Sequence, residues 1–288
     1  MSLANLLLIL GSACMHVIVH VGLKKAHDRT SFVWWMLVWA MVLFSPILFL
    51  FGRPLPLLAV GIMLLSSVFE AAYFLAIAKA YRGADLSVIY PLARGTAPAL
   101  LLVWSALILR EPISAGGIAG VITIAAGLYV INLPRLGAWR EPLRSLRQIG
   151  PRWALLAGLS TSLYTAIDKI GISLVPPLLY TYVALGITTL WVTPFTLREV
   201  GWSGLRQELR ASRLGTVLAG LMTLGAYGIV LMAMQFGTPA SYAGAVREFS
   251  VVLGAAYGVF VLKESRSPMR IVGSLMVAVG VAMIGLLG

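Results

Sequence analysis

Three charged residues lie in the middle of long apolar segments of this 288-residue chain: Glu70, Arg94 and Arg247. A charged side chain at the centre of a bilayer costs about 2.5–3.5 kcal/mol even on permissive insertion scales. Residues of this kind face the protein interior or a water-filled path, where they bind ions or substrates. The sequence therefore indicates binding or transport chemistry within a membrane.

The two arginines allow two interpretations. A guanidinium group binds a carboxylate or a phosphate through two parallel hydrogen bonds, so each arginine could bind an anionic substrate. Alternatively, each could pair with a carboxylate of the protein, because Glu248 directly follows Arg247 and Arg94 could reach Glu70. The cost of an unpaired buried charge slightly favours structural pairing.

Glu70 also has two interpretations, of equal weight: a proton- or cation-binding carboxylate, or the partner of Arg94. Its glutamine variant should abolish pH-dependent transport if Glu70 carries protons. His16 and His20 are four residues apart on one helical face. No third ligand accompanies them, so packing or cavity lining is favoured over a metal site.

Tyrosines inside the apolar segments complete the predicted substrate site. A tyrosine facing inward combines an apolar ring with one hydroxyl group, which suits a small amphipathic solute. The site is predicted to lie near the membrane midplane and to comprise His16, Glu70, Tyr73, Tyr90, Arg94, Tyr164, Tyr227 and Arg247. Asp168 and Lys169 lie near a segment end, and we expect Lys169 to extend toward the lipid head groups.

The stretch 90–98 reads Tyr-Pro-Leu-Ala-Arg-Gly-Thr-Ala-Pro. Its two prolines and one glycine predict a broken helix at membrane depth. Irregular backbone is tolerated there only where it is buried in protein or lines a cavity. We therefore expect this stretch to form a cavity wall.

The elements that position these residues are membrane spans. The chain is 60% hydrophobic and 11% charged, with a mean hydropathy of +0.94, whereas ordinary soluble domains are about 25% charged. Each predicted span holds roughly 20 residues, enough to cross a hydrocarbon core of about 30 Å. The ten predicted spans are 3–23, 32–51, 57–80, 86–109, 113–133, 153–175, 178–197, 214–236, 240–262 and 269–287.

The spans repeat after five. Arg247 follows Arg94 by 153 residues (247 − 94), and at the same offset Glu264 follows Glu111 and Gly273 follows Gly120. An odd number of spans per repeat inserts the second copy in the opposite sense. The predicted fold is an all-α membrane protein with ten helices in two inverted five-helix repeats around a central cavity. The predicted units are a first repeat at 1–133, a basic connecting loop at 134–152 and a second repeat at 153–288.

Basic residues predict the orientation. Of 22 Lys and Arg residues, 17 lie in loops on one side of the predicted membrane and two, Arg53 and Arg110, lie on the other. Such a bias places the richer side in the cytoplasm, and both termini then face outward. The basic residues lie in loops between spans, so no nucleic-acid partner is expected.

Glycines at matching positions predict close packing of the fifth and tenth spans. Gly116, Gly120 and Gly127 recur at spacings of four and seven residues, and Gly273 and Gly280 occupy the corresponding positions in the last span. Small residues at such spacings let helix backbones approach closely. We expect these two spans to be scaffold and not part of the substrate pathway.

The ten spans in two halves, the proline-containing fourth span and the glutamates Glu111 and Glu264, each with a glycine nine residues on, resemble the EamA-type transporters of the drug/metabolite transporter superfamily. The resemblance covers the whole chain and implies alternating access through a central cavity. The chain is also similar to the YddG-type exporters, and this similarity implies amino-acid export. Family members commonly keep both termini in the cytoplasm, opposite to the charge bias, so orientation and direction stay open.

We expect a multi-pass secondary transporter in the cell inner (plasma) membrane that exports amino acids, with exchange of phosphorylated or phosphonate anions as the alternative. Its expected partners are a small-molecule substrate and the lipid bilayer, and a monomer is sufficient. No nucleophile–base pair, metal cluster or P-loop occurs in the sequence. We therefore expect neither an enzyme nor a cofactor.

Overall fold

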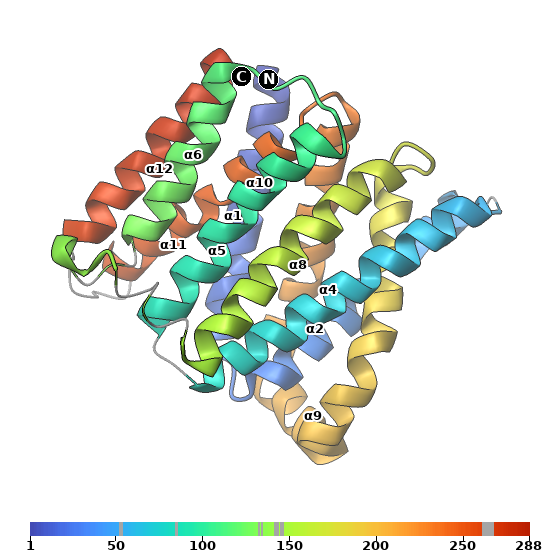
Figure 1. The fold of residues 1–288 in the computed structure, drawn as a ribbon. Helices are drawn as coiled ribbons and strands as arrows, with labels where there is room; N and C mark the ends of the chain where they lie inside the picture. The colour runs from blue at the N-terminus through green and yellow to red at the C-terminus, as the bar shows by residue number, and fades with distance from the viewer. Residues whose placement is uncertain are drawn as a thin grey trace.

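The computed structural model describes residues 1–51, 54–83, 86–131, 133, 135–140, 144, 147–260 and 268–288, and leaves the side chains of 24, 78, 81–83, 86–93, 136 and 258–260 undescribed. Within these ranges the chain forms helices and no strand (Figure 1). The α-helices are α1 (Leu3–Lys25), α2 (Arg29–Phe44), α3 (Pro46–Leu50), α4 (Leu57–Gly83), α5 (Leu86–Leu107), α6 (Ala115–Ile131), α8 (Ile149–Gly171), α9 (Pro177–Gln235), α10 (Ala240–Arg247), α11 (Phe249–Phe260) and α12 (Pro268–Leu287). A short 3-10 helix, η1 (Leu136–Ala138), lies between α6 and α8.

Capping side chains and prolines fix where several helices begin. Ser2 Oγ accepts a hydrogen bond from the Asn5 amide at the start of α1 (3.2 Å), and Asp28 Oδ1 accepts one from the Ser31 amide at the start of α2 (2.7 Å). These contacts satisfy amides that have no acceptor within the helix. A proline is the first residue of α3, α9 and α12, where its missing amide costs no helical hydrogen bond.

Six helical segments of the described chain have the composition of membrane segments. α1, α4, α9, α12 and the α2–α3 segment are long and apolar enough to cross a bilayer, and α6 is a shorter apolar helix. α9 contains the seventh and eighth predicted spans as two helices joined across a kink. It departs from helical geometry at Gly201, whose φ of 63° favours glycine, and at Ser212.

The predicted break in the fourth span is wrong. α5 continues as one α-helix from Leu86 to Leu107, through both prolines. A proline inside a helix removes one backbone hydrogen bond, and the packing of α5 against α8 and α10 holds the helix together. The interruption occurs instead in the ninth span, where α10 ends at Arg247, Glu248 takes the capping position, and α11 begins at Phe249.

The helices of the two sequence halves pack mainly against each other. The most extensive contacts join α2 with α9, α6 with α12, α4 with α8, α5 with α8, and α1 with α9. Figure 1 shows α4 beside α8 and α6 beside α12, with both termini at the same end of the bundle. There the Met1 amino group donates to the Gly288 carbonyl oxygen (2.6 Å). The buried interior is therefore built from both halves together.

The predicted close approach of the glycine-bearing spans is confirmed. A Cβ atom added to Gly120 would lie 2.9 Å from the Gly280 carbonyl oxygen, and one added to Gly127 would lie 2.8 Å from that of Gly273. The contacts are reciprocal, because a Cβ atom on Gly273 would lie 2.5 Å from the Gly127 oxygen. The residue order along α6 is opposite to that along α12, so these two helices cross antiparallel (Figure 1).

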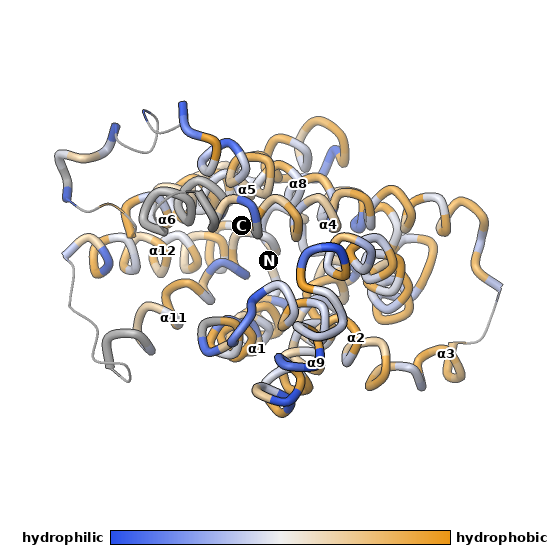
Figure 2. Tube along the Cα trace, turned by 90° about the horizontal axis from the view of Figure 1, so that it is seen from below, coloured by the Kyte–Doolittle hydropathy of each residue, from blue (hydrophilic) through white to orange (hydrophobic). Residues whose placement is uncertain are grey.

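Apolar side chains cover the outside of the bundle. Large exposed residues include Phe49, Leu57, Leu190 and Leu286, each at least 73% accessible. Figure 2 shows apolar residues along the helices and hydrophilic stretches mainly where helices begin or end. Soluble monomers rarely expose so much contiguous apolar surface, whereas a bilayer covers it.

Candidate functional site

A ladder of three tyrosines lies between α4, α8 and α9. The Tyr73 and Tyr164 rings are 6.3 Å apart, and the Tyr164 and Tyr227 rings are 6.0 Å apart, both in edge-to-face geometry. Aromatic pairs prefer this arrangement because a positive ring edge meets a negative ring face. Tyr164 and Tyr227 are buried, and Tyr73 is partly buried. Three of the four predicted tyrosines therefore form one continuous surface.

Arg247 closes one end of this ladder. Its guanidinium carbon lies 5.9 Å from the centroid of the Tyr227 ring, within cation–π range. The residue is only 6% exposed. Its Nε has no hydrogen-bond partner among the described residues. Arg247 is also the last residue of α10, so it lies where the helix is interrupted.

Arg94 has different surroundings. Its Nη1 donates to both carboxylate oxygens of Glu248 (3.0 and 2.9 Å), and its Nη2 donates to His20 Nε2 (2.6 Å). The Glu248 side chain is 2% exposed. The predicted pairing of Arg94 with Glu70 is therefore wrong. Glu248 does not pair with its neighbour Arg247, because the turn after α10 directs its carboxylate toward α5.

Glu70 is buried and bonds to a hydroxyl group of α9. Thr188 Oγ1 donates to Glu70 Oε2 (2.6 Å). The described residues form no ion pair with this carboxylate, although it lies within electrostatic reach of Arg247 and Asp168. His16 also lies within reach of the Arg247 charge, and its buried Nε2 has no described hydrogen-bond partner.

Asp168 is a buried polar centre near the end of α8. It is 1% exposed and accepts hydrogen bonds from Ser66 of α4 and from Tyr180 and Tyr227 of α9. Three hydroxyl donors stabilise a carboxylate that has left water. The bond to Tyr227 also holds the ring that faces Arg247. One sequence signal was available: Asp168 is acidic within an apolar segment, as Glu70 is.

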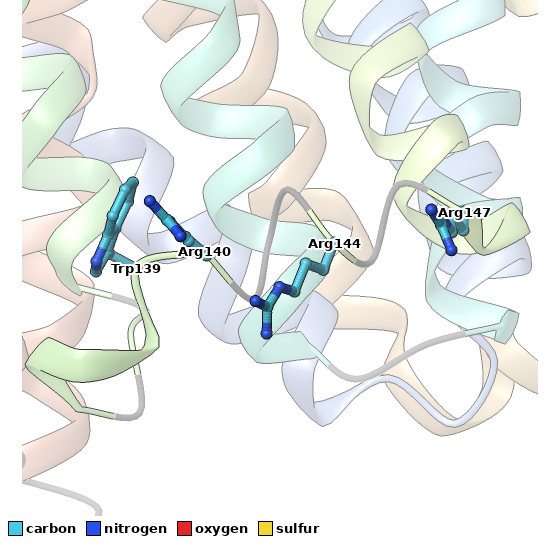
Figure 3. A pocket seen from close by; sticks show the side chains of 4 residues that line it. All are labelled: Trp139, Arg140, Arg144 and Arg147. Carbon is cyan, nitrogen blue, oxygen red and sulfur yellow. The ribbon is translucent and has the colours of Figure 1, made fainter.

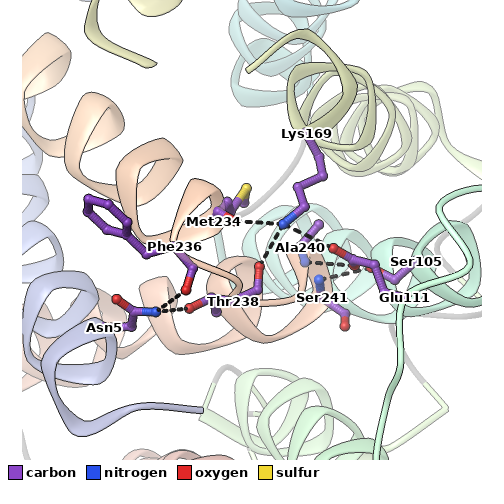
Figure 4. A network of polar contacts seen from close by, with 9 residues as sticks. All are labelled: Asn5, Ser105, Glu111, Lys169, Met234, Phe236, Thr238, Ala240 and Ser241. Carbon is purple, nitrogen blue, oxygen red and sulfur yellow. Dashed lines mark hydrogen bonds and ion pairs between the residues drawn. The ribbon is translucent and has the colours of Figure 1, made fainter. Parts of the chain in front are cut away.

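The terminal-side network is a second group of polar contacts, at the end of the bundle that holds the termini (Figure 4). Lys169 Nζ donates to the carbonyl oxygens of Met234 (2.7 Å) and Thr238 (3.0 Å) and lies 3.3 Å from Glu111 Oε1. Glu111 Oε2 accepts from the Ala240 amide at the start of α10 (2.8 Å). The network also contains Asn5, Phe236, Ser105 and Ser241.

The prediction that Lys169 extends toward the lipid head groups is therefore wrong, because its ammonium group binds protein oxygens. The last carbonyl oxygens of a helix have no amide donor within that helix. At the end of α9, the Lys169 ammonium group donates to one of them, that of Met234. The network joins the loop after α5, the end of α8 and the turn between α9 and α10. It fastens the two sequence halves at this end.

The structure brings seven of the eight predicted site residues into one buried neighbourhood. Tyr73, Tyr164, Tyr227 and Arg247 are joined by ring contacts, Glu70 and His16 lie within reach of Arg247, and Arg94 bonds to the residue after Arg247. Tyr90 belongs to α5, but its side chain lies outside the described residues. Glu264, which matches Glu111 in the sequence repeat, also lies outside the described residues.

A surface hollow of about 590 Å³ lies in the connection between α6 and α8, away from this neighbourhood (Figure 3). Trp139, Arg140, Arg144 and Arg147 line it, and the Arg140 guanidinium lies 4.5 Å from the Trp139 ring centroid. Tryptophan and arginine in a short loop are typical of contact with lipid head groups. The hollow is therefore not the candidate substrate site.

Comparison with known proteins identifies the family. A model of the EamA-like transporter family matches residues 3–133 and, a second time, residues 148–286. The chain belongs to the EamA-like transporter family. Members of this family are secondary transporters of small molecules in the drug/metabolite transporter superfamily, so this EamA-like chain is a multi-pass membrane transporter.

The fold of the EamA-like chain also occurs in solved structures. One crystal structure of a protein superposes with a TM-score of 0.73 over 99% of this chain and 98% of that chain, at 14% sequence identity. At this identity the likeness concerns the fold alone. No curated protein matches the sequence.

Proposed function

We propose that this EamA-like transporter exports amino acids or similar small zwitterionic metabolites across the cell inner membrane by alternating access. The substrate binds near mid-depth, between the two five-helix repeats, among His16, Glu70, Tyr73, Tyr90, Tyr164, Tyr227 and Arg247. Arg94, also in the predicted set, is engaged by Glu248 and His20. Transport is driven by a solute or ion gradient. A single chain carries the complete site.

The observation that carries this proposal is the composition of the buried neighbourhood. It holds a cation, Arg247, beside the tyrosine ladder, and a buried carboxylate, Glu70, within electrostatic range of Arg247 and Tyr164. A zwitterionic solute carries one group of each sign close to an apolar body. Polar groups fixed in an apolar pocket give orientation, and the aromatic walls give contact area. Buried charges without an ion-pair partner are costly, and binding a solute of opposite charge offsets that cost.

Reciprocal packing supports an inverted repeat. Equivalent glycines in the two halves contact each other across an antiparallel pair, α6 and α12. α1 and α8 are the first helices of their halves, α4 is the third span of the first half, and the last part of α9 is the third span of the second half. The packing of α4 on α8 is therefore equivalent to the packing of α9 on α1. These are the contacts expected when a two-fold axis in the membrane plane relates the repeats.

The orientation rests on the 17 basic residues on one side, which place both termini outside the cytoplasm. A cytoplasm-active reporter fused after Gly288 tests this arrangement. Activity of that reporter refutes the orientation, because an outward terminus cannot show it. The fold and the site do not depend on the result.

The alternative is exchange of phosphorylated or phosphonate anions, favoured by two arginines in one neighbourhood. Glu248 and His20 engage Arg94, which leaves less positive charge for a dianion than the sequence suggested. Counterflow in proteoliposomes decides between the two. Vesicles loaded with unlabelled L-amino acids should accumulate the labelled amino acid, and vesicles loaded with organophosphates should not. Uptake only with organophosphates refutes amino-acid export.

A further inference from the structure

The two arginines at equivalent positions of the repeat have unequal surroundings. Both Glu248 oxygens lie against Arg94 Nη1, and His20 accepts from Arg94 Nη2. A substrate anion binding Arg94 would compete with Glu248, whose carboxylate is almost fully buried. Displacement would leave a buried charge without its partner, which is strongly unfavourable. Arg94 therefore serves to join α5 to the interrupted ninth span.

Among the described residues, no carboxylate forms a hydrogen bond or ion pair with Arg247, although the charge of Glu248 lies within electrostatic range of it. The residue is more than nine-tenths buried, and its Nε donor has no hydrogen-bond partner among the described residues. The described contact of its guanidinium group is with the face of Tyr227, which offers no acceptor for Nε. A buried donor of this kind is stabilised by any acceptor that enters the site, and most of all by a charged one.

The position of Arg247 suits an incoming ligand. It ends α10, where the helical backbone is interrupted, and it faces the tyrosine ladder. Glu70 is buried, and its charge interacts with that of Arg247, so this neighbourhood offers a group of each sign to a solute. Asp168 holds Tyr227 in place through the tyrosine hydroxyl, so it acts as a positioning residue.

We propose that Arg247 binds the anionic group of the substrate, the carboxylate in the case of an amino acid, while Arg94 is structural. The inference rests on the transport function proposed above and assigns different roles to two residues that the sequence treats as equivalent. The guanidinium fork binds a carboxylate through two hydrogen bonds, from Nε and the adjacent Nη. Substrate selection then depends first on the anionic group, and the tyrosine surface receives the apolar body.

The test compares three variants with the wild-type protein in detergent: Arg247→Gln, Arg247→Lys and the double variant Arg94→Gln/Glu248→Gln. The double variant removes both charges of the structural pair, so it leaves no unpartnered buried ion. Four probes share one ring: L-phenylalanine, 3-phenylpropionate without the ammonium group, 2-phenylethylamine without the carboxylate, and phenylphosphonate. Affinity is measured from the ligand-dependent rise in melting temperature.

We expect wild type to bind phenylalanine and 3-phenylpropionate but not 2-phenylethylamine. Arg247→Gln should weaken binding of the acids by roughly 30-fold or more, as for loss of one partner of a buried charge pair. The double variant should stay within about threefold of wild type. Arg247→Lys keeps the positive charge but loses the two parallel hydrogen bonds of the guanidinium group. If Arg247→Gln does not fold, this variant provides the test. Unchanged affinity of Arg247→Lys for 3-phenylpropionate would then overturn the inference.

Three other results are decisive. Equal binding of phenylalanine by Arg247→Gln and wild type overturns the inference while leaving amino-acid transport intact. Arg247-dependent binding of phenylphosphonate alone refutes the amino-acid proposal but supports the role of Arg247. Absence of Arg247-dependent binding for all four probes overturns the inference.

Discussion

The terminal-side network leads to a quantitative prediction for Glu111→Gln. Glu111 joins two parts of the network, since its Oε1 lies 3.3 Å from Lys169 Nζ and its Oε2 accepts from the Ala240 amide. The glutamine carbonyl oxygen can keep the bond to the Ala240 amide, but the NH2 group that replaces the second oxygen cannot accept from the Lys169 ammonium group. The variant thus loses one charge-assisted contact and little else.

The magnitude follows from that single contact. Loss of an ion pair costs less than about 1 kcal/mol when the pair is exposed and about 3–5 kcal/mol when it is buried. The Lys169 and Glu111 side chains are 21% and 10% exposed, and Lys169 keeps its two carbonyl acceptors, so we expect about 1.5 kcal/mol. About 1.5 kcal/mol corresponds to roughly a tenfold change in the ratio of two states. If the network exists only while this end is closed, Glu111→Gln should raise the fraction open at this end about tenfold.

Spin-label distance measurements between Ile108→Cys and Phe236→Cys test this shift. Both positions are exposed, at 57% and 64%, and they lie at this end of α5 and α9. The exposed Cys14 is first replaced by serine. We expect a longer-distance population to grow in Glu111→Gln and not in the control Arg110→Gln, which neutralises the neighbouring exposed residue. Identical distance distributions in Glu111→Gln and wild type would refute the closing role of the network.

Three further predictions concern the interior. Glu70→Gln should abolish the pH dependence of transport in reconstituted vesicles if its carboxylate exchanges protons, and an unchanged pH profile contradicts that role. Asp168→Asn should lower stability by about 1–3 kcal/mol, because three hydroxyl donors lose a charged acceptor; a melting temperature equal to that of wild type would contradict the bonding described here. Gly273→Ala should cost about 1–3 kcal/mol, since its Cβ would lie 2.5 Å from the Gly127 oxygen, whereas Gly61→Ala, with nothing within 4 Å, is the matched control in the same melting experiment.

Much of the architecture could be predicted from the sequence because lipid imposes simple rules. Apolar length predicted helical spans, and glycine spacing predicted the contact between α6 and α12, since only small residues permit it. The position of the helix interruption could not be predicted in this way. Proline predicts a missing hydrogen bond, but whether the helix breaks depends on what packs around it, and the break lies at Glu248 and not at Pro91 or Pro98.

The sequence could select candidate residues for the site, but it could not predict how they pair. Polar residues at mid-depth are rare, so the sequence could select Glu70, Arg94 and Arg247. Which carboxylate meets which arginine depends on how the halves interlock, and the sequence alone pointed Arg94 to Glu70 instead of Glu248. The bonding of Asp168 could not be predicted for a related reason: its three hydroxyl donors come from two other helices, and nothing local to Asp168 reveals them.

The interlocked halves bear on the order in which the protein is made. Arg94 precedes Glu248 by 154 residues, and Glu70 precedes Thr188 by 118. At about 5–20 residues per second, the ribosome needs roughly 8–30 s to extend from Arg94 to Glu248. During that interval the newly inserted first half must hold its charges in the bilayer before their later partners exist. Assembly of the mature bundle is thus a late event in biogenesis. Until the second half is inserted, the insertion machinery or the lipid has to stabilise the buried charges of the first half.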